Sequence, residues 1–394
     1  MPFDAPHSLA MTAEMRLLIA AARDPSARAA EECRRLCALE IDWDRLLSLA
    51  ARHRVHPHIW RALRNCPHVP APVRQHLEGR CHDVARRNLL LTGKLLRILD
   101  RLESHGIRAV AYKGPALAQH VYGEISQREF DDLDILLLLR DAMRAVNILR
   151  HEGLEADEQI PAAATERYLR LEREFHLSSD DGAAVELHWA VCPRYFALDL
   201  PVESLLDRSQ CGELLGRPVR RLSWPDLLQV LCVHGALHCW SRLEWVCAVD
   251  RLVRLEHDLD WPATLAGGQR SGAGRMLLLG LALANRLLDT PLPARVASAI
   301  AGERQLARLL ATAVRWMDCP REPRRGLAHC AFHIRCRERI RDGIQYVLRL
   351  GLMPNAAQLA TPSAAGPLRA LHPPLRLARL ACKWMGQVTH IALR

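Results

Sequence analysis

Asp-Leu-Asp-Ile-Leu-Leu, at residues 132–137, is the stretch on which the expected fold depends. The run is short and its other four positions are apolar, which is typical of a buried β-strand. Side chains alternate between the two faces of a strand, so Asp132 and Asp134 project on the same side, about 6 to 7 Å apart. Two carboxylates this close repel each other, and a divalent cation relieves the repulsion. The pair predicts a Mg²⁺ site, and a solvated strand end is the alternative.

Short segments on both sides of this strand predict a small α/β module. Their apolar runs alternate with Gly, Pro and Asp at positions where turns are expected. The expected elements are a strand over residues 107–112, a helix from Pro115 to Tyr122, the strand 132–137, a helix over about 140–152, and a hairpin with strands at 175–178 and 184–191 around an Asp-Gly turn.

Helical patterns occupy the rest of the chain. Apolar residues recur at three- and four-residue steps from residue 12 to about 104, and again from a predicted N-cap at Ser223 onward. The later helices are expected over about residues 227–239, 243–256, 274–288 and 304–316. The Pro- and Ala-rich residues 353–374 are expected to be extended chain or a loop that leads into a last short helix. The predicted domains are a helical region at 1–104, an α/β core at 105–222 and a helical domain at 223–394.

Composition excludes several classes of protein. The 394 residues are 49% hydrophobic and 25% charged, so the chain is long enough for two or three packed domains and is not mainly disordered. No apolar run approaches the roughly 20 residues that cross a bilayer, and no export signal precedes the first helix, so we expect a cytoplasmic protein without a membrane partner. The net charge of +10 comes almost entirely from arginines spread along helical segments. Nucleic acid is therefore a less favoured partner than a nucleotide.

Glu186 offers a third carboxylate for the Asp132–Asp134 site. It lies in the second strand of the expected hairpin, where Glu186 and His188 share one face while Val185 and its apolar neighbours share the other. If that hairpin lies beside residues 132–137, three acidic side chains meet on neighbouring strands. Such a set is typical of two-metal phosphoryl-transfer sites.

Lys113 and Gly114 are expected to bind phosphate. Glycine lets the backbone approach an anion closely, and the helix that follows offers its N-terminal N–H groups. Arg128 either contacts phosphate as well or pairs with Glu124 or Asp131.

A histidine pair and a Cys/His-rich segment are two further candidates for metal binding. His234 and His238 lie one helical turn apart, a spacing that permits metal binding, but no acidic residue lies between them. We favour a partly buried pair that lies near the nucleotide or bonds to Asp250. The thirteen cysteines show no C-x-x-C motif, which favours free thiols, and the Cys/His-rich residues 329–336 match no standard zinc module.

These motifs together resemble the uncharacterised nucleotidyltransferase family of the DNA polymerase β superfamily. The resemblance covers about residues 40 to 290. The matching segments are Tyr112-Lys113-Gly114-Pro115-Ala116-Leu117, Tyr122-Gly123, Arg128, residues 132–136, Val185-Glu186-Leu187-His188-Trp189, and the residues His234, His238, Trp240, Arg242, Leu243, Trp245 and Asp250. One departure from the superfamily is that Lys113-Gly114-Pro115 replaces the more usual Gly-Ser or Gly-Gly before the helix.

The resemblance implies a small polymerase-β-like core inside a mainly helical α+β chain. It implies transfer of a nucleoside monophosphate from an NTP to an unidentified acceptor, with Mg²⁺ (or Mn²⁺) held by Asp132, Asp134 and Glu186. Lys113, Gly114, Arg128, His188, His234 and His238 are the predicted nucleotide contacts. Family members occur beside genes for peptide natural products, which suggests a small-molecule, peptide or protein acceptor. The alternatives are a catalytically inactive nucleotide-binding scaffold or sensor, and an RNA-modifying enzyme, which predicts salt-dependent RNA binding.

Overall fold

A five-stranded mixed sheet forms the centre of the protein. The computed structural model describes residues 11–157, 160, 162–319 and 326–353. The strand order is β1-β2-β5-β4-β3, and only the β2–β5 pair is parallel. The strands are β1 (Ala109–Ala111), β2 (Asp132–Leu137), β3 (Glu155–Ala156), β4 (Glu174–Ser178) and β5 (Ala184–His188).

The predicted hairpin lies where the acidic site requires it. β4 and β5 are antiparallel around the Asp-Gly turn, and β5 pairs with the first five residues of β2, 132–136. In this register Asp134 and Glu186 are direct partners, so their side chains lie on the same face of the sheet. On the opposite face Leu133, Ile135, Val185 and Leu187 are fully buried, and their burial fixes the register because a slip by one residue would expose them.

Helices join the strands of this core. They are α6 (Gly114–Tyr122), α7 (Ala142–Arg150), α8 (Ala162–Leu171) and α9 (Val202–Asp207). A second, two-stranded sheet of β6 (Gln210–Leu214) and β7 (Arg217–Arg221) follows. The sequence did not predict this second sheet. Its turn at Leu215-Gly216 has positive φ at both residues, and leucine at the first of these positions hides the usual turn signature.

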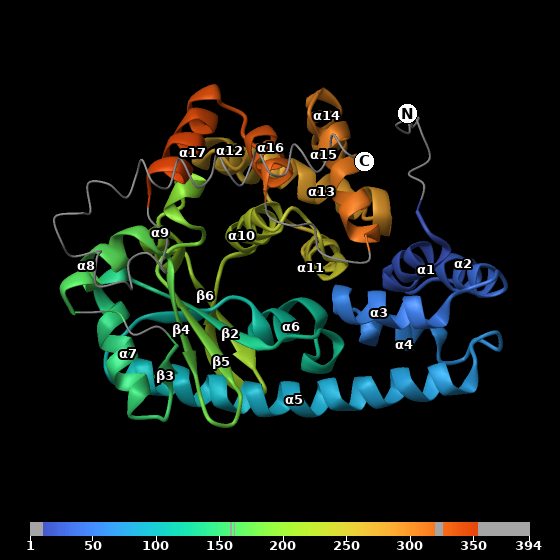
Figure 1. Cartoon of the computed structure of the whole chain (residues 1–394), viewed down its shortest axis with the longest axis horizontal. Coiled ribbons are helices and arrows are strands. Elements are labelled where there is room, and N and C mark those ends of the chain that lie inside the picture. Colours follow the sequence, from blue (N-terminus) through green and yellow to red (C-terminus); the bar gives the residue numbers. More distant parts are fainter. Residues whose placement is uncertain (1–10, 158–159, 161, 320–325, 354–394) are drawn as a thin grey trace, which may run out of the picture.

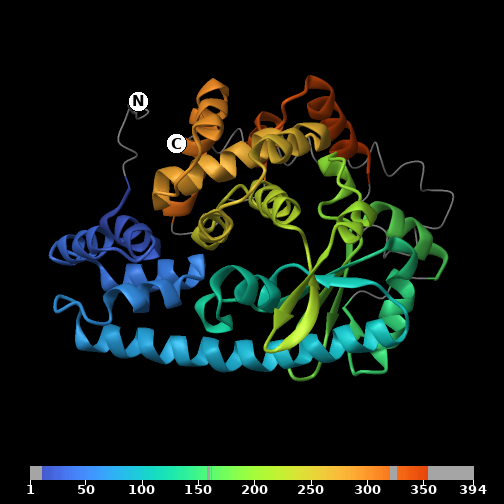
Figure 2. The ribbon, with the colours of Figure 1, turned by 180° about the vertical axis from the view of Figure 1, so that it is seen from behind.

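The N-terminal helices rest on one long helix. They are α1 (Ala13–Ala22), α2 (Ala27–Cys37), α3 (Trp43–His53), α4 (His56–Leu63) and α5 (Ala71–Ser104). With 34 residues, α5 is about 50 Å long. It runs beneath both the N-terminal helices and the sheet (Figures 1 and 2), and contacts α4, α6, α7 and β1.

The C-terminal helices lie across the molecule from α5, with the sheet and α6 between them (Figure 1). They are α10 (Trp224–Leu237), α11 (Leu243–Leu255), α12 (Trp261–Ser271), α13 (Gly274–Leu288), α14 (Ala294–Gly302), α15 (Leu306–Asp318), α16 (Leu327–Arg335) and α17 (Ile340–Leu352). Among the described helices, none has both the length and the apolar composition that a bilayer crossing requires.

The expected α+β fold and most of its elements are confirmed. Helices fill residues 13–104 between their turns, and the helix predicted over 274–288 has those bounds. Ser223 caps α10 only indirectly, because its hydroxyl bonds the Asp226 carboxylate rather than a backbone N–H. The described cysteines are free thiols, as expected. The domain boundaries at 104 and 222 stay predictions, and the stretch expected to be extended after residue 353 lies outside the described residues.

A buried histidine ties the N-terminal helices to the C-terminal ones. The N–H of Leu243, at the start of α11, donates to Nδ1 of His53 at 3.0 Å. Nε2 of His53 therefore carries the proton and donates to the carbonyl of Met317 in α15 at 3.0 Å. Burial, with Arg52 and Arg242 nearby, lowers the pKa of His53 to about 3. Burial also lowers the pKa of His58 in α4 to about 3.

These neutral histidines predict that acid destabilises the junction. Their folded pKa lies below the unfolded value, so the stability they contribute is lost as pH falls from about 6.5 towards 3. Each is expected to lower the free energy of unfolding by about 1.4 kcal/mol per pH unit in that range. Urea unfolding of the wild type and His53→Gln between pH 7 and pH 4 checks this. In the variant the free energy of unfolding should fall less steeply with decreasing pH, by the amount that one proton contributes, about 1.4 kcal/mol per pH unit. Equal slopes would contradict the neutral bridge.

Candidate active site

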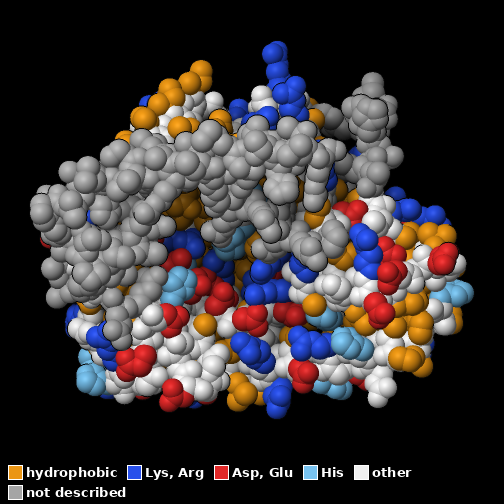
Figure 3. Space-filling view, viewed as in Figure 1, with side chains coloured by type: hydrophobic (Ala, Val, Ile, Leu, Met, Phe, Trp, Pro, Cys, Tyr) orange, Lys and Arg blue, Asp and Glu red, His pale blue; other side chains and the backbone are white. Residues whose placement is uncertain are grey.

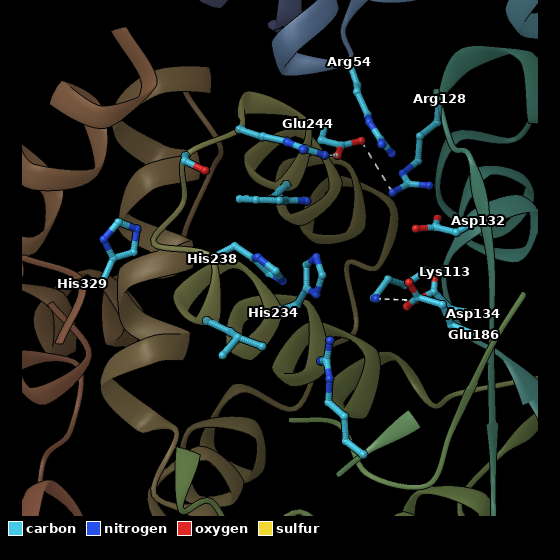
Figure 4. A pocket seen from close by; sticks show the side chains of 15 residues that line it. Arg54, Lys113, Arg128, Asp132, Asp134, Glu186, His234, His238, Glu244 and His329 are labelled. Atoms are coloured by element: carbon cyan, nitrogen blue, oxygen red, sulfur yellow. Dashed lines mark hydrogen bonds and ion pairs between the residues drawn. The ribbon is translucent and has the colours of Figure 1, made fainter. Parts of the chain in front are cut away.

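A polar cavity of about 290 Å³ lies between the sheet and the α10–α11 turn. Charged and histidine side chains gather in this hollow in the middle of the face shown in Figure 3, and Figure 4 shows the side chains that line it. The core contributes Lys113, Arg128, Asp132, Asp134, Arg173 and Glu186, and the helical regions contribute Arg54, His234, Leu237, His238, Ser241, Arg242, Glu244, Trp245 and His329.

Asp134 is the most buried of the three predicted carboxylates, with 2% of its surface exposed. Its Oδ1 accepts a hydrogen bond from Nζ of Lys113 at 2.5 Å and lies 3.2 Å from Nε2 of His188. Burial alone would raise the pKa of Asp134, but these two cations hold it well below its usual range. Asp134 is therefore ionised, and its charge stabilises the folded protein.

His188 lies behind the carboxylates and does not line the cavity. It is fully buried, with Nε2 3.1 Å from Glu186 and Nδ1 2.8 Å from Glu174. Burial opposes a charge on the ring, but its bonds to Asp134, Glu174 and Glu186 raise the pKa of His188 well above its usual value. The structure thus places this predicted nucleotide contact beneath the acidic side chains as their internal counter-ion.

His176 in β4 is a second counter-ion of the acidic side chains, and it lies on the solvent-exposed side of them. It lies between Glu174 and Glu186, and its bonds to both carboxylates raise the pKa of His176 to about 10. Burial would raise the pKa of Glu186, but His176 and His188 bring it down to about 2. Two imidazolium groups therefore flank Glu186.

Asp132 differs from its two partners. Burial and the neighbouring Asp134 charge raise the pKa of Asp132 to about 6, although Lys113 opposes them. Its negative charge is thus under-compensated by the described residues, as is expected of a carboxylate that shares a cation from solution. Oxygen donors from Asp132, Asp134 and Glu186 suit Mg²⁺ or Mn²⁺.

Ligand atoms of Asp134, Glu186 and His188 lie within 4.8 Å of one another, the only such group found among the described residues. His188 does not line the cavity, and its Nδ1 is paired with Glu174, so the ligand atoms of this group that face the cavity are those of Asp134 and Glu186. The residues present therefore fit an ion bound by carboxylates, with Asp132 beside this group.

Lys113 and Gly114 have roles that the sequence did not reveal. Nζ of Lys113 faces the cavity but is paired with Asp134. Gly114 has φ +53°, and a Cβ there would lie 2.9 Å from the carbonyl oxygen of Asp132. The glycine is therefore required for the close approach of α6 to β2, whether or not its backbone also meets a nucleotide.

Arg128 pairs with neither Glu124 nor Asp131, the partners considered from the sequence. Its Nη2 lies 3.7 Å from Glu244 in α11, whereas Asp131 pairs with Arg54 and Arg87. Of the two alternatives for Arg128, the local ion pair is not formed, because the segment before β2 places Arg128 at the cavity and leaves Asp131 exposed.

His234 and His238 line the cavity together with Trp245. The two rings lie 4.6 Å apart and each is within 5.4 Å of the indole. Burial lowers the pKa of His234 well below its usual value. The sequence also suggested a hydrogen bond from these histidines to Asp250. In the structure Asp250 accepts hydrogen bonds from Thr290 and Arg254 instead.

Trp240 fixes the turn between α10 and α11, the two helices that bring His234 and Trp245 to the cavity. Cys239 and Trp240 both have positive φ, which reverses the chain within a few residues. The indole is fully buried, and Cβ atoms added at Gly235 and Gly280 would lie 2.6 Å and 2.9 Å from it. The two glycines are therefore needed to accommodate this ring.

The Cys/His-rich residues 329–336 do not gather as metal ligands in the described part of the chain. His329 stacks on Trp316 at 4.9 Å. His333 lies 3.0 Å from the Tyr346 hydroxyl and 3.1 Å from the Leu237 carbonyl. These residues pack α16 against its neighbours.

Several cavity residues were missed from the sequence. Arg173 directly precedes β4. Arg242 and Trp245 lie within the segment of the family resemblance that contains His234 and His238, so these two residues were noticed in the sequence but given no role. Arg54 follows α3 in the N-terminal region, and nothing local distinguishes it from the many other arginines.

Comparisons with known proteins identify the family. No curated protein matches the chain. The solution structure of the antibiotic-resistance factor ANT(2'')-Ia has 15% identity and a TM-score of 0.26, covering 53% of this chain and 90% of its own. A nucleotidyltransferase-like antigen from Paracoccidioides brasiliensis has 16% identity and a TM-score of 0.33, covering 53% and 95%. The model of the family described as uncharacterised nucleotidyltransferase matches residues 40–289, more than half of the chain, and the protein therefore belongs to that family of nucleotidyltransferases.

Proposed function

We propose that the cavity catalyses metal-dependent transfer of a nucleoside monophosphate from an NTP to an acceptor, with release of pyrophosphate. The observation that supports this most directly is the acidic group of Asp132, Asp134 and Glu186 on one face of β2 and β5, at a cavity that also holds arginines. Carboxylates and cations side by side match a triphosphate that carries its own divalent ion.

Each group has a role in this reaction. Asp132, Asp134 and Glu186 would hold Mg²⁺ (or Mn²⁺), which when bound neutralises phosphate charge and lowers the pKa of the acceptor group. Lys113 and Arg128 contact phosphate oxygens, and His234 and His238 contact the nucleotide from the helical side. The acceptor oxygen or nitrogen bonds to the α-phosphorus, the bond from that phosphorus to the β-phosphate bridging oxygen breaks, and the acceptor proton leaves to water.

A second cavity supports a small acceptor. Its volume is about 480 Å³, and it shares Arg173, Glu186, Leu237, His238 and His329 with the first. One part of the remaining wall is formed by Pro193, Tyr195, Tyr346 and Leu350, and another part is polar, with Glu172, Glu174, His176 and His333. An acceptor with an apolar body and a hydroxyl or amine at the Glu186 end fits this wall, and a peptide natural-product intermediate has that chemistry.

Thermal unfolding with ATP, GTP, CTP and UTP, each with and without Mg²⁺, tests the proposed function. At about 100 times Kd a nucleotide should stabilise the protein by roughly 2.7 kcal/mol, and we expect this only with Mg²⁺. In Asp132→Asn the nucleotide shift should vanish while the ligand-free protein gains about 1–3 kcal/mol at pH 8, because the raised pKa of Asp132 makes its charge unfavourable there.

Asp83→Asn is the matched control, since it removes a carboxylate 60% exposed on α5 and should change neither quantity. If no nucleotide stabilises the wild type, the protein is a scaffold or acts on another ligand. If Asp132→Asn keeps the full shift, the acidic group does not bind the metal–nucleotide complex.

A further inference from the structure

Three arginines from separate parts of the chain meet at one end of the cavity. Arg54 follows α3 in the N-terminal region, Arg128 precedes β2 in the core, and Arg242 precedes α11 in the C-terminal region. All three line the cavity together with Glu244. In Figure 4 the side chains of Arg54, Arg128 and Glu244 point toward one another beside Asp132.

Arg128 has donors for which the described residues supply no acceptor. The residue is 8% exposed, and its Nε and Nη1 are buried without a hydrogen-bond partner in the described structure. Its contact with Glu244 is an ion pair at 3.7 Å, which is too long for a hydrogen bond. Native proteins leave few buried donors unsatisfied, and each indicates a missing acceptor such as a bound ligand.

Arg54 is held beside Arg128 by its position at the end of α3 and by an ion pair. It has φ 53° and ψ 48° at the end of α3, a left-handed conformation that is unusual for arginine. Its Nη2 lies 2.8 Å from Asp131 on the solvent side. This conformation ends α3, since the Arg54 N–H bonds to the carbonyls of Ala50 and Ala51, and it directs the side chain towards the cavity.

Glu244 is a buried carboxylate that lies near both Arg128 and Arg242. It is 3% exposed, and lies 3.7 Å from Arg128 and 3.9 Å from Arg242, whose guanidinium also lies over the Trp245 ring at 5.6 Å. Arg54, in turn, is paired with Asp131. The Arg128 donors that have no acceptor among the described residues, at a point of the cavity where three guanidinium groups converge, fit an anion with several oxygen atoms.

We propose that Arg54, Arg128 and Arg242 form a subsite for the β- and γ-phosphates of the nucleotide, an inference that rests on the proposed function. The electron pair of the broken phosphorus–oxygen bond then remains on a pyrophosphate held by these arginines. Because attack is in line with the leaving group, the acceptor enters from the opposite end, where Glu186 joins the second cavity. Glu244 is the buried counter-ion of Arg128 and Arg242, and it competes with the phosphates for these two guanidinium groups.

Inorganic tripolyphosphate tests the subsite, because it has the phosphates without the nucleoside. Calorimetric titration of the wild type, Arg54→Gln and the double variant Arg128→Gln/Glu244→Gln should give a Kd higher by about 10- to 100-fold in each variant. The double variant removes both members of the buried pair, so that neither is left unpaired. Glu244→Gln alone should bind tripolyphosphate several-fold more tightly, and a merely structural role would not produce this gain.

Arg64→Gln, at an exposed site in the N-terminal region, removes one positive charge and should leave the Kd unchanged. Arg54→Lys should recover part of the lost affinity. The subsite is wrong if Mg²⁺–NTP binds the wild type while tripolyphosphate does not, or if Arg54→Gln and Arg64→Gln behave alike, and in both cases the proposed function stands. If neither NTP nor tripolyphosphate binds the wild type, both proposals are overturned.

Discussion

Replacing Asp134 with asparagine is expected to raise the Kd for the Mg²⁺–nucleotide complex at least about 100-fold and to destabilise the ligand-free protein by about 2–4 kcal/mol. The second effect arises because Asp134 is the buried anion between Lys113 and His188. Its lowered pKa means that this stabilisation is present above about pH 4 and is lost as pH falls further. Calorimetric titration and urea unfolding at pH 7.5 measure the two effects.

Asp132→Asn is the informative comparison for this result. Both variants remove one carboxylate from the same face of β2, and both should lose nucleotide binding. Asp132→Asn should raise the free energy of unfolding of the ligand-free protein and Asp134→Asn should lower it, because the pKa is raised at Asp132 and lowered at Asp134. A shift of stability in the same direction in both variants would contradict the charge arrangement described here.

Trp240→Ala is expected to destabilise the protein by about 3–5 kcal/mol, since it empties the space of a fully buried indole. The two glycines that face the ring, Gly235 and Gly280, have no side chains that could fill the gap. Nucleotide affinity should fall as well, because Arg242 and Trp245 follow directly on the turn. Urea unfolding and titration with Mg²⁺–nucleotide measure the two losses.

Trp240→Phe serves as the control for that substitution. Phenylalanine keeps most of the ring volume, and the indole Nε1 has no hydrogen-bond partner among the described residues that the change could remove. We therefore expect a distinctly smaller loss than with alanine. Equal losses would show that cavity formation is not the cause.

The central strands were predictable because their signals are local. Alternation at residues 132–137 places both acids on one face, and the Asp-Gly turn sets the register of β4 and β5. The sequence also placed Glu186 and His188 on one face, which the structure confirms. It did not show that Glu186 lies beside the cavity while His188 lies beneath it, because depth depends on how β4 and Tyr112 pack around the ring.

The remaining cavity residues come from long-range packing. His53, the residue before Arg54, is bonded to both Leu243 and Met317, and these bonds hold the end of α3 against α11 and α15. Arg128 has its partner in α11 rather than in its own segment. Helical periodicity predicts neither contact, since it describes the face of a helix and not what covers that face.

The bond between His53 and Leu243 also bears on how the protein is made. The ribosome releases the N-terminal helices first, at about 5–20 residues per second, so Arg54 is exposed well before α11 exists to meet it. The carboxylates of β2 and β5 appear in between. A nascent chain therefore has no complete nucleotide site until Met317, which bonds the other ring nitrogen of His53, has emerged as well, and cellular nucleotide can assist only a late stage of folding.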